Sequence, residues 1–375
     1  MPSSTTRTLF VASLLAIAAL SACTSVQDTA EDTTSTSRQS PEGTTTTTVN
    51  YSSTIPDPSS DWPDARRSHG LVTLADGTVL LFGGRTNTGN ARTYLADTWE
   101  LEDRDSWKKT AAGTPTPRGQ FAFAPLPDGS AVLVGGYVGD RFTYPGTWRY
   151  LLKTWVRLET TNEPSARAGS VAAFDAESNV LVMFGGAERP TVAELPTNET
   201  WLLNLEDSSW LEVSPEVSPR PKSEGHPTLF ELAMVYDSES DRVILLIGGD
   251  ETWAYDANTN TWEELSPPGL EADFMVAAAY DPIADRVVTH GGAPSELSTE
   301  TWLFDYNTDS WAQVETVSTP GPVGDHAITY DAVNNVTLLF GGAADLIPLD
   351  GLGDVSDKLW QFDGSDWTEV SPASP

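Results

Sequence analysis

Short, mainly apolar runs recur along the chain, and each is followed directly by two glycines. The pairs end at Gly84, Gly136, Gly186, Gly249, Gly292 and Gly342. Runs such as VLLF and VILLI do not alternate between apolar and polar residues, which is typical of strands that are covered on both faces. Because glycine permits positive φ and close backbone approach, the pairs predict closely packed strand ends.

Two tryptophans follow each glycine pair. The first position holds Trp99, Trp148, Trp201, Trp253, Trp302 and Trp360, and the second holds Trp107, Trp155, Trp210, Trp262, Trp311 and Trp367. Twelve of the 13 tryptophans therefore occupy two repeating positions, and Trp62 stands outside them. The glycine pairs recur about every 50 residues, a period that indicates a propeller or a solenoid.

Each repeat contains four strand-like segments. Turn sequences such as ADG, PDG and DSESD separate the first two segments, as hairpins require. Six units of this kind predict an all-β fold, a six-bladed β-propeller of four-stranded blades over residues 61–375.

The repeat resembles the kelch repeat, and through it the propeller group that includes galactose oxidase. The matching features are the glycine pair, the two tryptophans and an arginine at the start of three units, namely Arg66, Arg118 and Arg167. The resemblance covers Trp62 to Val370 in six copies and implies the propeller fold.

The closure of the ring is less evident from the sequence. The first unit begins with its own innermost strand and the last ends with its own outermost strand, so no blade shared between the chain ends is expected. Residues 44–62 are a hypothetical brace for the seam between the first and last blades.

The N-terminal residues resemble a bacterial lipoprotein signal. Arg7 precedes an apolar run from Leu9 to Leu20, too short to span a bilayer comfortably, and Leu20-Ser21-Ala22-Cys23 resembles a lipobox. This resemblance implies a signal peptide over 1–22 and lipidation of Cys23, hence a membrane-anchored protein of the bacterial cell envelope facing the periplasm or the exterior. The alternative is an ordinary cleaved signal. Residues 23–60, rich in Thr and Ser, predict a disordered tether.

The charge balance excludes one class of partner. The formal net charge is −33 at pH 7, which opposes contacts to phosphate backbones, so nucleic acid is not an expected partner. A monomer is expected, without a cofactor.

The candidate ligand-binding face carries the long loops between the second and third strands of each blade. The candidate residues are arginines able to grip carboxylates and aromatic residues able to stack on a sugar or peptide: Arg66, Arg85, Arg92, Tyr94, Arg118, Arg141, Phe142, Tyr144 and Arg167. The alternative is structural, with these arginines pinning loops through ion pairs.

The histidines bear on the enzyme hypotheses. The galactose oxidase resemblance would require a copper site with a Cys joined to a Tyr, but the one cysteine lies in the lipobox, and the four histidines are His69, His226, His290 and His326. His69 and His326 occupy equivalent positions in adjacent blades, where a metal would need a third ligand such as Asp325. Hydrogen-bonded structural histidines are the alternative, and neither a catalytic residue nor a metal site is predicted.

His290 takes the place of Phe82, Phe184 and Phe340 before its glycine pair, so it is predicted to pack between blades with a hydrogen-bond partner. The favoured function is a binding module for a protein or a glycan. Two alternatives remain, a carbohydrate-active enzyme similar to a sugar mutarotase and an envelope scaffold without a small ligand.

Overall fold

The structure is a computed structural model that describes residues 61–88, 91–110, 114–139, 142–188, 196–220, 232–248, 251–267, 277–292, 297–344 and 354–371. The chain divides into two compact units, residues 1–45 and 46–375, and the described residues all belong to the second. The predicted signal peptide, Cys23 and tether lie outside the described residues. No helix in the described ranges has the length and apolar character needed to cross a membrane.

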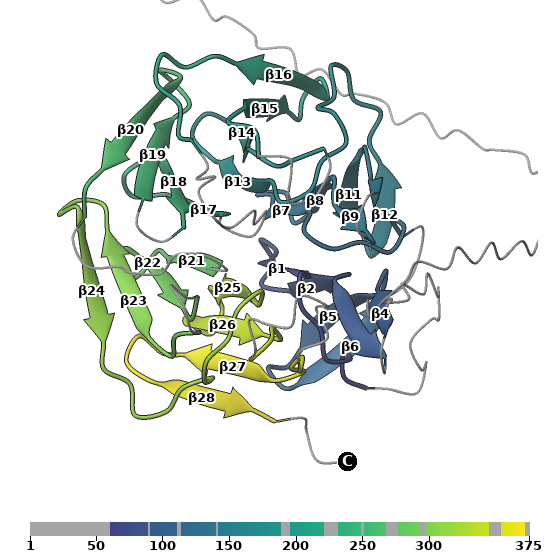
Figure 1. The fold of residues 1–375 in the computed structure, drawn as a ribbon, viewed down its shortest axis with the longest axis vertical. Helices are drawn as coiled ribbons and strands as arrows, with labels where there is room; N and C mark the ends of the chain where they lie inside the picture. Colours follow the sequence, from purple (N-terminus) through teal and green to yellow (C-terminus); the bar gives the residue numbers. More distant parts are fainter. Residues whose placement is uncertain are drawn as a thin grey trace, which may run out of the picture. The chain divides into compact units, whose positions relative to one another are not determined.

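Six antiparallel sheets of four strands form the fold (Figure 1). Blade 1 contains β1 (Gly70–Thr73), β2 (Val79–Phe82), β5 (Thr98–Glu102) and β6 (Ser106–Thr110). Blade 2 contains β7 (Ala122–Pro125), β8 (Ala131–Val134), β11 (Thr147–Leu151) and β12 (Thr154–Arg157). Blade 3 contains β13 (Val171–Asp175), β14 (Val180–Phe184), β15 (Thr200–Asn204) and β16 (Ser209–Val213).

The other three blades follow in chain order. Blade 4 contains β17 (Leu232–Asp237), β18 (Arg242–Ile247), β19 (Glu251–Asp256) and β20 (Thr261–Leu265). Blade 5 contains β21 (Ala277–Asp281), β22 (Arg286–His290), β23 (Thr301–Asp305) and β24 (Ser310–Val314). Blade 6 contains β25 (Ala327–Asp331), β26 (Val336–Phe340), β27 (Leu359–Phe362) and β28 (Trp367–Val370).

The predicted six-bladed β-propeller is therefore confirmed. In Figure 1 the first strand of each blade, from β1 to β25, faces the centre of the ring and the fourth lies at its rim. Two further hairpins follow the glycine pairs of blades 1 and 2, formed by β3 (Arg85–Thr88) with β4 (Ala91–Tyr94) and by β9 (Tyr137–Val138) with β10 (Phe142–Thr143). The sequence analysis treated these segments as loops.

Apolar contacts between neighbouring blades form the core. Strands β2 and β8 are buried at every position. Leu80 and Phe82 of blade 1, for example, pack in one cluster with Leu133 and Trp155 of blade 2. The continuous apolar runs in the sequence thus reflect strands that are covered by a neighbouring blade on each face.

In blades 1, 2, 5 and 6 the second glycine of the pair connects its blade to the next one around the ring. The amide of Gly84 donates to the carbonyl of Arg118 at 2.9 Å, and the amide of Gly136 donates to that of Arg167 at 2.8 Å. Gly84 has a φ of 89°, and a Cβ there would lie 2.7 Å from the carbonyl oxygen of Arg67. A side chain at Gly84 would therefore collide with the segment that enters its own blade.

The seam between blades 6 and 1 closes with the same hydrogen bonds. The amide of Gly342 donates to the carbonyl of Arg66 at 2.9 Å, and the amide of Ser68 donates to that of Asp325 at 3.0 Å. Trp62 adds a contact of its own, since its indole nitrogen donates to the carbonyl of Asp357 at 2.8 Å. Each blade is built from one continuous stretch of the chain, so the ring closes without a shared blade.

Candidate functional site

The antiparallel blades give the ring two different faces. The glycine pairs and the hairpins that follow them mark one end of the channel, which we call the loop face. The turns between the first and second strands, such as the turn from Thr73 to Val79, mark the opposite end, which we call the hairpin face. Each candidate residue from the sequence that the structure describes belongs to a segment of the loop face.

Arg66 is fully buried on the loop face and forms a bidentate ion pair. Its two terminal nitrogens lie 2.8 Å from the two carboxylate oxygens of Asp97, and one of them also donates to the carbonyl of Gly83. Burial by itself raises the pKa of Asp97, but Arg66 and the indole of Trp99 outweigh it and lower this pKa below its ordinary value. Arg66 therefore holds the glycine pair and the third strand of its own blade together.

Arg167 has a similar environment in blade 3. It donates to the carbonyl of Gly185 at 3.0 Å and to Oε2 of Glu199 at 2.7 Å. The side chain of Arg167 is 3 % exposed, so its guanidinium is buried and bonded to groups within the protein.

Arg118 differs because blade 2 has Gly146 where blade 1 has Asp97. Its guanidinium donates to the carbonyls of Gly135 and Thr116 and lies 4.5 Å from the ring centroid of Tyr144. Burial lowers the pKa of Arg118 to about 10. Arg118 is thus a buried cation held by carbonyl oxygens and an aromatic ring.

The two additional hairpins carry part of the accessible surface of the loop face. They contact one another through the rings of Tyr94 and Tyr137, whose centroids are 5.6 Å apart. Phe142 on β10 is 60 % exposed, while Arg92 and Tyr144 are half-buried. Arg141, another candidate from the sequence, lies outside the described residues. We call these two hairpins the ridge; together they carry one exposed aromatic ring, Phe142, and one half-buried arginine, Arg92.

Two buried arginines, Arg67 and Arg85, share one carboxylate near the start of the first hairpin. Arg67 and Arg85 both lie 3.8 Å from Oδ2 of Asp325, which also accepts a hydrogen bond from Ser68. The pKa of Arg67 is lowered by burial and by the charges of Arg85 and Arg92, against the opposing effect of Asp325. Asp325 therefore lies between two buried arginines, in a chain whose net charge is strongly negative.

Two of the cavities formed by the described residues lie at the centre of the ring. The larger one, of about 440 Å³, opens toward the hairpin face and is lined by residues from all six innermost strands, including Phe123, Phe174 and Tyr280. The smaller one, of about 190 Å³, lies toward the loop face. The sequence analysis did not predict the larger cavity, although a Tyr-Asp pair ends the innermost strand in each of blades 4 to 6.

His69 and His326 both line the smaller cavity. Burial lowers the pKa of His326 to about 3, and burial together with Arg66 lowers the pKa of His69 well below its ordinary value, so both rings are neutral at pH 7. Asp325, considered above as a third metal ligand, instead faces two arginines. Within the described ranges, no three His, Cys, Asp or Glu side chains are grouped to hold a metal ion. His226 lies outside them.

His290 is 1 % exposed and packs against Trp367 and His326 of blade 6, between blades 5 and 6 as predicted. Its Nδ1 lies 3.0 Å from Oγ1 of Thr301, and its Nε2 lies 3.2 Å from the carbonyl oxygen of Gly321. A carbonyl only accepts, so Nε2 carries the proton and Nδ1 accepts from the Thr301 hydroxyl. Burial lowers the pKa of His290 to about 4. The imidazole is a neutral packing residue with both nitrogens bonded.

Comparison with known proteins gives consistent matches. The profile of the KLHDC2/KLHL20/DRC7 Kelch-repeats domain matches residues 33–249, more than half of the chain. The chain is 24 % identical over 323 residues to the dynein alpha chain of the flagellar outer arm of Chlamydomonas reinhardtii, covering 78 % of this chain and 7 % of that protein.

Two plant proteins are also similar. The F-box/kelch-repeat protein At1g51550 of Arabidopsis thaliana is 24 % identical over 234 residues, covering 56 % of this chain and 47 % of that protein. Adagio protein 3 of the same plant is 26 % identical over 167 residues, covering 42 % of this chain and 26 % of that protein. The chain thus spans less than half the length of each of these relatives. The profile match, together with six blades marked by glycine pairs and paired tryptophans, shows that the chain belongs to the Kelch-repeat family.

Proposed function

We propose that the propeller is a protein-binding module that recognises a carboxylate-bearing segment of its partner on the loop face. The carrying observation is the pair of hairpins β3–β4 and β9–β10, which carries the exposed ring of Phe142 and the half-buried Arg92. An exposed aromatic ring and arginines are the residue types that most often supply binding energy at interfaces.

The buried arginines have a supporting role in this proposal. Arg66 and Arg118 donate to the carbonyls of Gly83 and Gly135, which precede the two hairpins, and so hold the start of each hairpin in place. Tyr144 and Tyr94 are held in turn by Arg118 and Tyr137. A ridge that is already rigid loses little conformational entropy when a partner binds, which favours recognition by this surface.

The proposal includes a location. The resemblance of the N-terminal residues to a lipoprotein signal supports a lipid anchor at Cys23, which would present the propeller to the periplasm or the exterior of a bacterial cell. Labelling with radioactive palmitate tests this part separately: incorporation that is lost in a Cys23→Ser variant supports the anchor, and equal labelling of both proteins contradicts it.

Site-specific photocrosslinking tests the binding surface. A photoreactive phenylalanine analogue is placed at position 142, or at position 156 as a control, because Val156 is also exposed but lies on the outer strand β12. We expect a discrete crosslinked protein from position 142 only, and its loss in an Arg92→Glu background. Equal products at both positions, or no effect of Arg92→Glu, would contradict the proposal. A glycan that competes with the crosslink would identify a carbohydrate as the ligand of this surface.

A further inference from the structure

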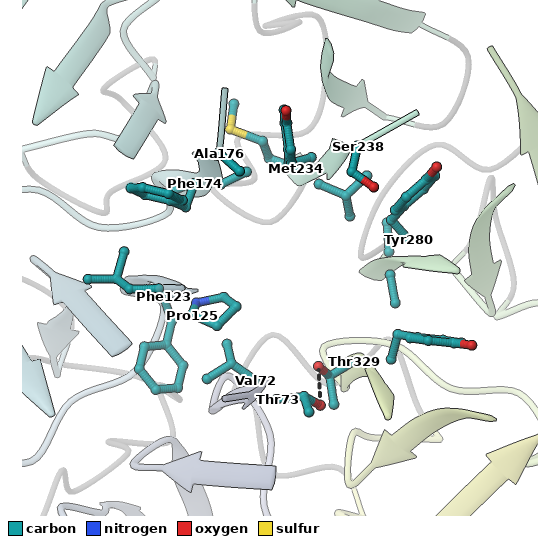
Figure 2. Close-up of a pocket in the computed structure, with 18 of the residues that line it drawn as sticks. Val72, Thr73, Phe123, Pro125, Phe174, Ala176, Met234, Ser238, Tyr280 and Thr329 are labelled. Atoms are coloured by element: carbon teal, nitrogen blue, oxygen red, sulfur yellow. Dashed lines mark hydrogen bonds between the residues drawn. The ribbon is translucent and has the colours of Figure 1, made fainter. Parts of the chain in front are cut away.

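The wall of the larger cavity combines apolar side chains with side chains that carry a hydroxyl group. Figure 2 shows Phe123, Phe174 and Met234 with Tyr280 and Thr329 around one open space. The lining includes no charged residue. Its volume of about 440 Å³ falls within the range of small-ligand pockets. The cavity thus offers an uncharged, partly aromatic surface at the hairpin face.

Blades 4 and 5 contribute the same side-chain arrangement to this cavity. The hydroxyl of Tyr236 donates to Oδ1 of Asp241 at 3.0 Å, and Oδ2 of Asp241 accepts from Asn258 at 3.1 Å. In blade 5 the hydroxyl of Tyr280 donates to Oδ1 of Asp285 at 2.8 Å. Both tyrosine rings line the cavity, so each ring has a carboxylate bonded to its outer end.

These carboxylates change the rings electronically. A phenol that donates a hydrogen bond to a carboxylate has a more electron-rich ring, which attracts a cation over its face more strongly. Burial and Asp241 raise the pKa of Tyr236 to about 12, and burial and Asp285 raise that of Tyr280. Both phenols therefore stay protonated at neutral pH and keep donating to their carboxylates.

The surroundings of the cavity mouth are negative. The hairpins that join the first and second strands of blades 3 to 6 contain the carboxylates Asp175, Glu177, Asp237, Glu239, Asp241, Asp281, Asp285 and Asp331. The same hairpins contain two arginines, and these pair with carboxylates of neighbouring hairpins, Arg242 with Asp256 at 3.4 Å and Arg286 with Asp305 at 2.8 Å. A concave site beneath charges of one sign concentrates ligands of the opposite sign.

We propose that this cavity binds a compact organic cation, a quaternary or methylated ammonium group, against the rings of Tyr236 and Tyr280. The uncharged lining suits a cation whose methyl groups make it weakly hydrated, because such a group needs no hydrogen-bond acceptor inside the site. The apolar wall of Phe123, Phe174 and Met234 contacts the methyl groups. The site lies at the opposite end of the channel from the loop face and does not depend on the function proposed there.

The test is calorimetric titration of the purified full-length chain with choline and with its uncharged isostere 3,3-dimethylbutan-1-ol. We expect choline to bind roughly tenfold more tightly than the isostere, since both fill the cavity but only choline gains from the rings and the negative field. Equal affinities of the two probes, or no heat from choline at millimolar concentration, would overturn the proposal.

Two variants test the contribution of the tyrosine rings and that of the carboxylates separately. Tyr280→Leu is expected to weaken choline binding roughly fivefold or more. Asp285→Asn keeps a hydrogen-bond acceptor for Tyr280. Asn335 stands at the equivalent position of blade 6, and both residues have a φ of 54°. The Asp285→Asn variant is therefore expected to fold. Asp285→Asn should weaken the binding of choline and leave the binding of the isostere unchanged. The control Glu216→Gln removes one exposed charge away from the cavity and should change neither.

A peptide titration identifies the source of the cation. Short peptides that contain trimethyl-lysine, lysine or norleucine are compared in the same experiment. Preference for trimethyl-lysine that is lost in Tyr280→Leu indicates a modified partner protein, whereas binding of choline alone indicates a free small molecule. If norleucine and trimethyl-lysine peptides bind equally and choline does not bind, the cavity is only an apolar pocket and the proposal is wrong.

Discussion

Oγ1 of Thr301 accepts a hydrogen bond from the indole nitrogen of Trp367 at 2.8 Å and so connects blade 5 to blade 6. The second tryptophan of a blade makes the same bond to the preceding blade in three further cases: Trp155 to Thr98, Trp210 to Thr147 and Trp262 to Thr200. The two tryptophan positions of the repeat therefore carry a polar connection between blades as well as apolar packing.

Thr301 is expected to matter more for stability than its counterpart Thr200. Thr301→Val removes the acceptor for Trp367 and the donor to His290, whereas Thr200→Val affects Trp262 alone. A buried polar group without a partner costs about 1–3 kcal/mol. Urea unfolding should show the larger loss for Thr301→Val. Equal losses for the two variants would contradict the role assigned to the His290 contact.

His290 should contribute to the pH dependence of the free energy of unfolding. Its pKa in the folded protein is about 4, against 6.5 for the ordinary value, so the unfolded chain takes up the proton first as the pH falls. The stability that neutral His290 provides is complete above pH 6.5 and is lost progressively between pH 6.5 and pH 4. Between pH 7 and pH 5 this loss is about 2 kcal/mol. Between pH 7 and pH 5, the free energy of unfolding measured in urea should therefore fall by about 2 kcal/mol less in His290→Phe than in the protein with His290. An identical pH slope in both proteins would be inconsistent with the buried neutral ring.

Gly84 and Gly129 form a matched pair for testing the glycine repeat. Both have positive φ, 89° and 80°, but a Cβ at Gly84 would meet the carbonyl of Arg67 and Cβ of His69 at 2.7 Å, whereas a Cβ at Gly129 meets nothing within 4 Å. Gly129→Ala should cost about 1–2 kcal/mol from the left-handed backbone alone. Gly84→Ala should cost a further ~1–3 kcal/mol from overpacking. Thermal unfolding of the two variants checks this order.

The Arg66–Asp97 ion pair is expected to be needed for folding. Asp97→Asn leaves a fully buried guanidinium without its carboxylate, which typically costs about 3–5 kcal/mol. A double-mutant cycle with Arg66→Leu and Asp97→Leu should show strong coupling. In the described part of the chain Arg118 has no carboxylate partner, so Arg118→Leu leaves no unpaired carboxylate and should lower the free energy of unfolding by less. If Arg118→Ala or Arg167→Ala abolished partner binding with unchanged unfolding, these arginines would belong to the ligand site itself.

Trp62 is expected to stabilise the seam. In blade 6 the residue equivalent to Thr301 is Leu359, and Nε1 of Trp107 has no hydrogen-bond partner in the part of the chain that the structure describes. Trp62 packs edge-on against Trp107 at 6.4 Å and bonds the carbonyl of Asp357. Trp62→Ala should therefore lower the free energy of unfolding by about 2 kcal/mol. A chain that begins at residue 61 keeps these contacts and should keep the stability of the full chain, and calorimetry of both checks the assignment.

The sequence by itself determined the blades and the packing position of His290. These depend on strand length, turn residues and the spacing of glycine and tryptophan, which act within one repeat of about 50 residues. An apolar run next to Gly291 already shows that position 290 lies inside, and a buried imidazole must find hydrogen-bond partners wherever the fold supplies them.

Only the tertiary structure decided which side chains meet and which stay accessible. From the sequence, Arg66 and Arg92 were equivalent candidates for binding, but the fold of blade 1 buries Arg66 on Asp97 and leaves Arg92 half-buried on a hairpin. The tyrosine cavity was missed for the same reason. Tyr236 and Tyr280 are separated by more than 40 residues, and only the curvature of the ring brings their rings to one channel.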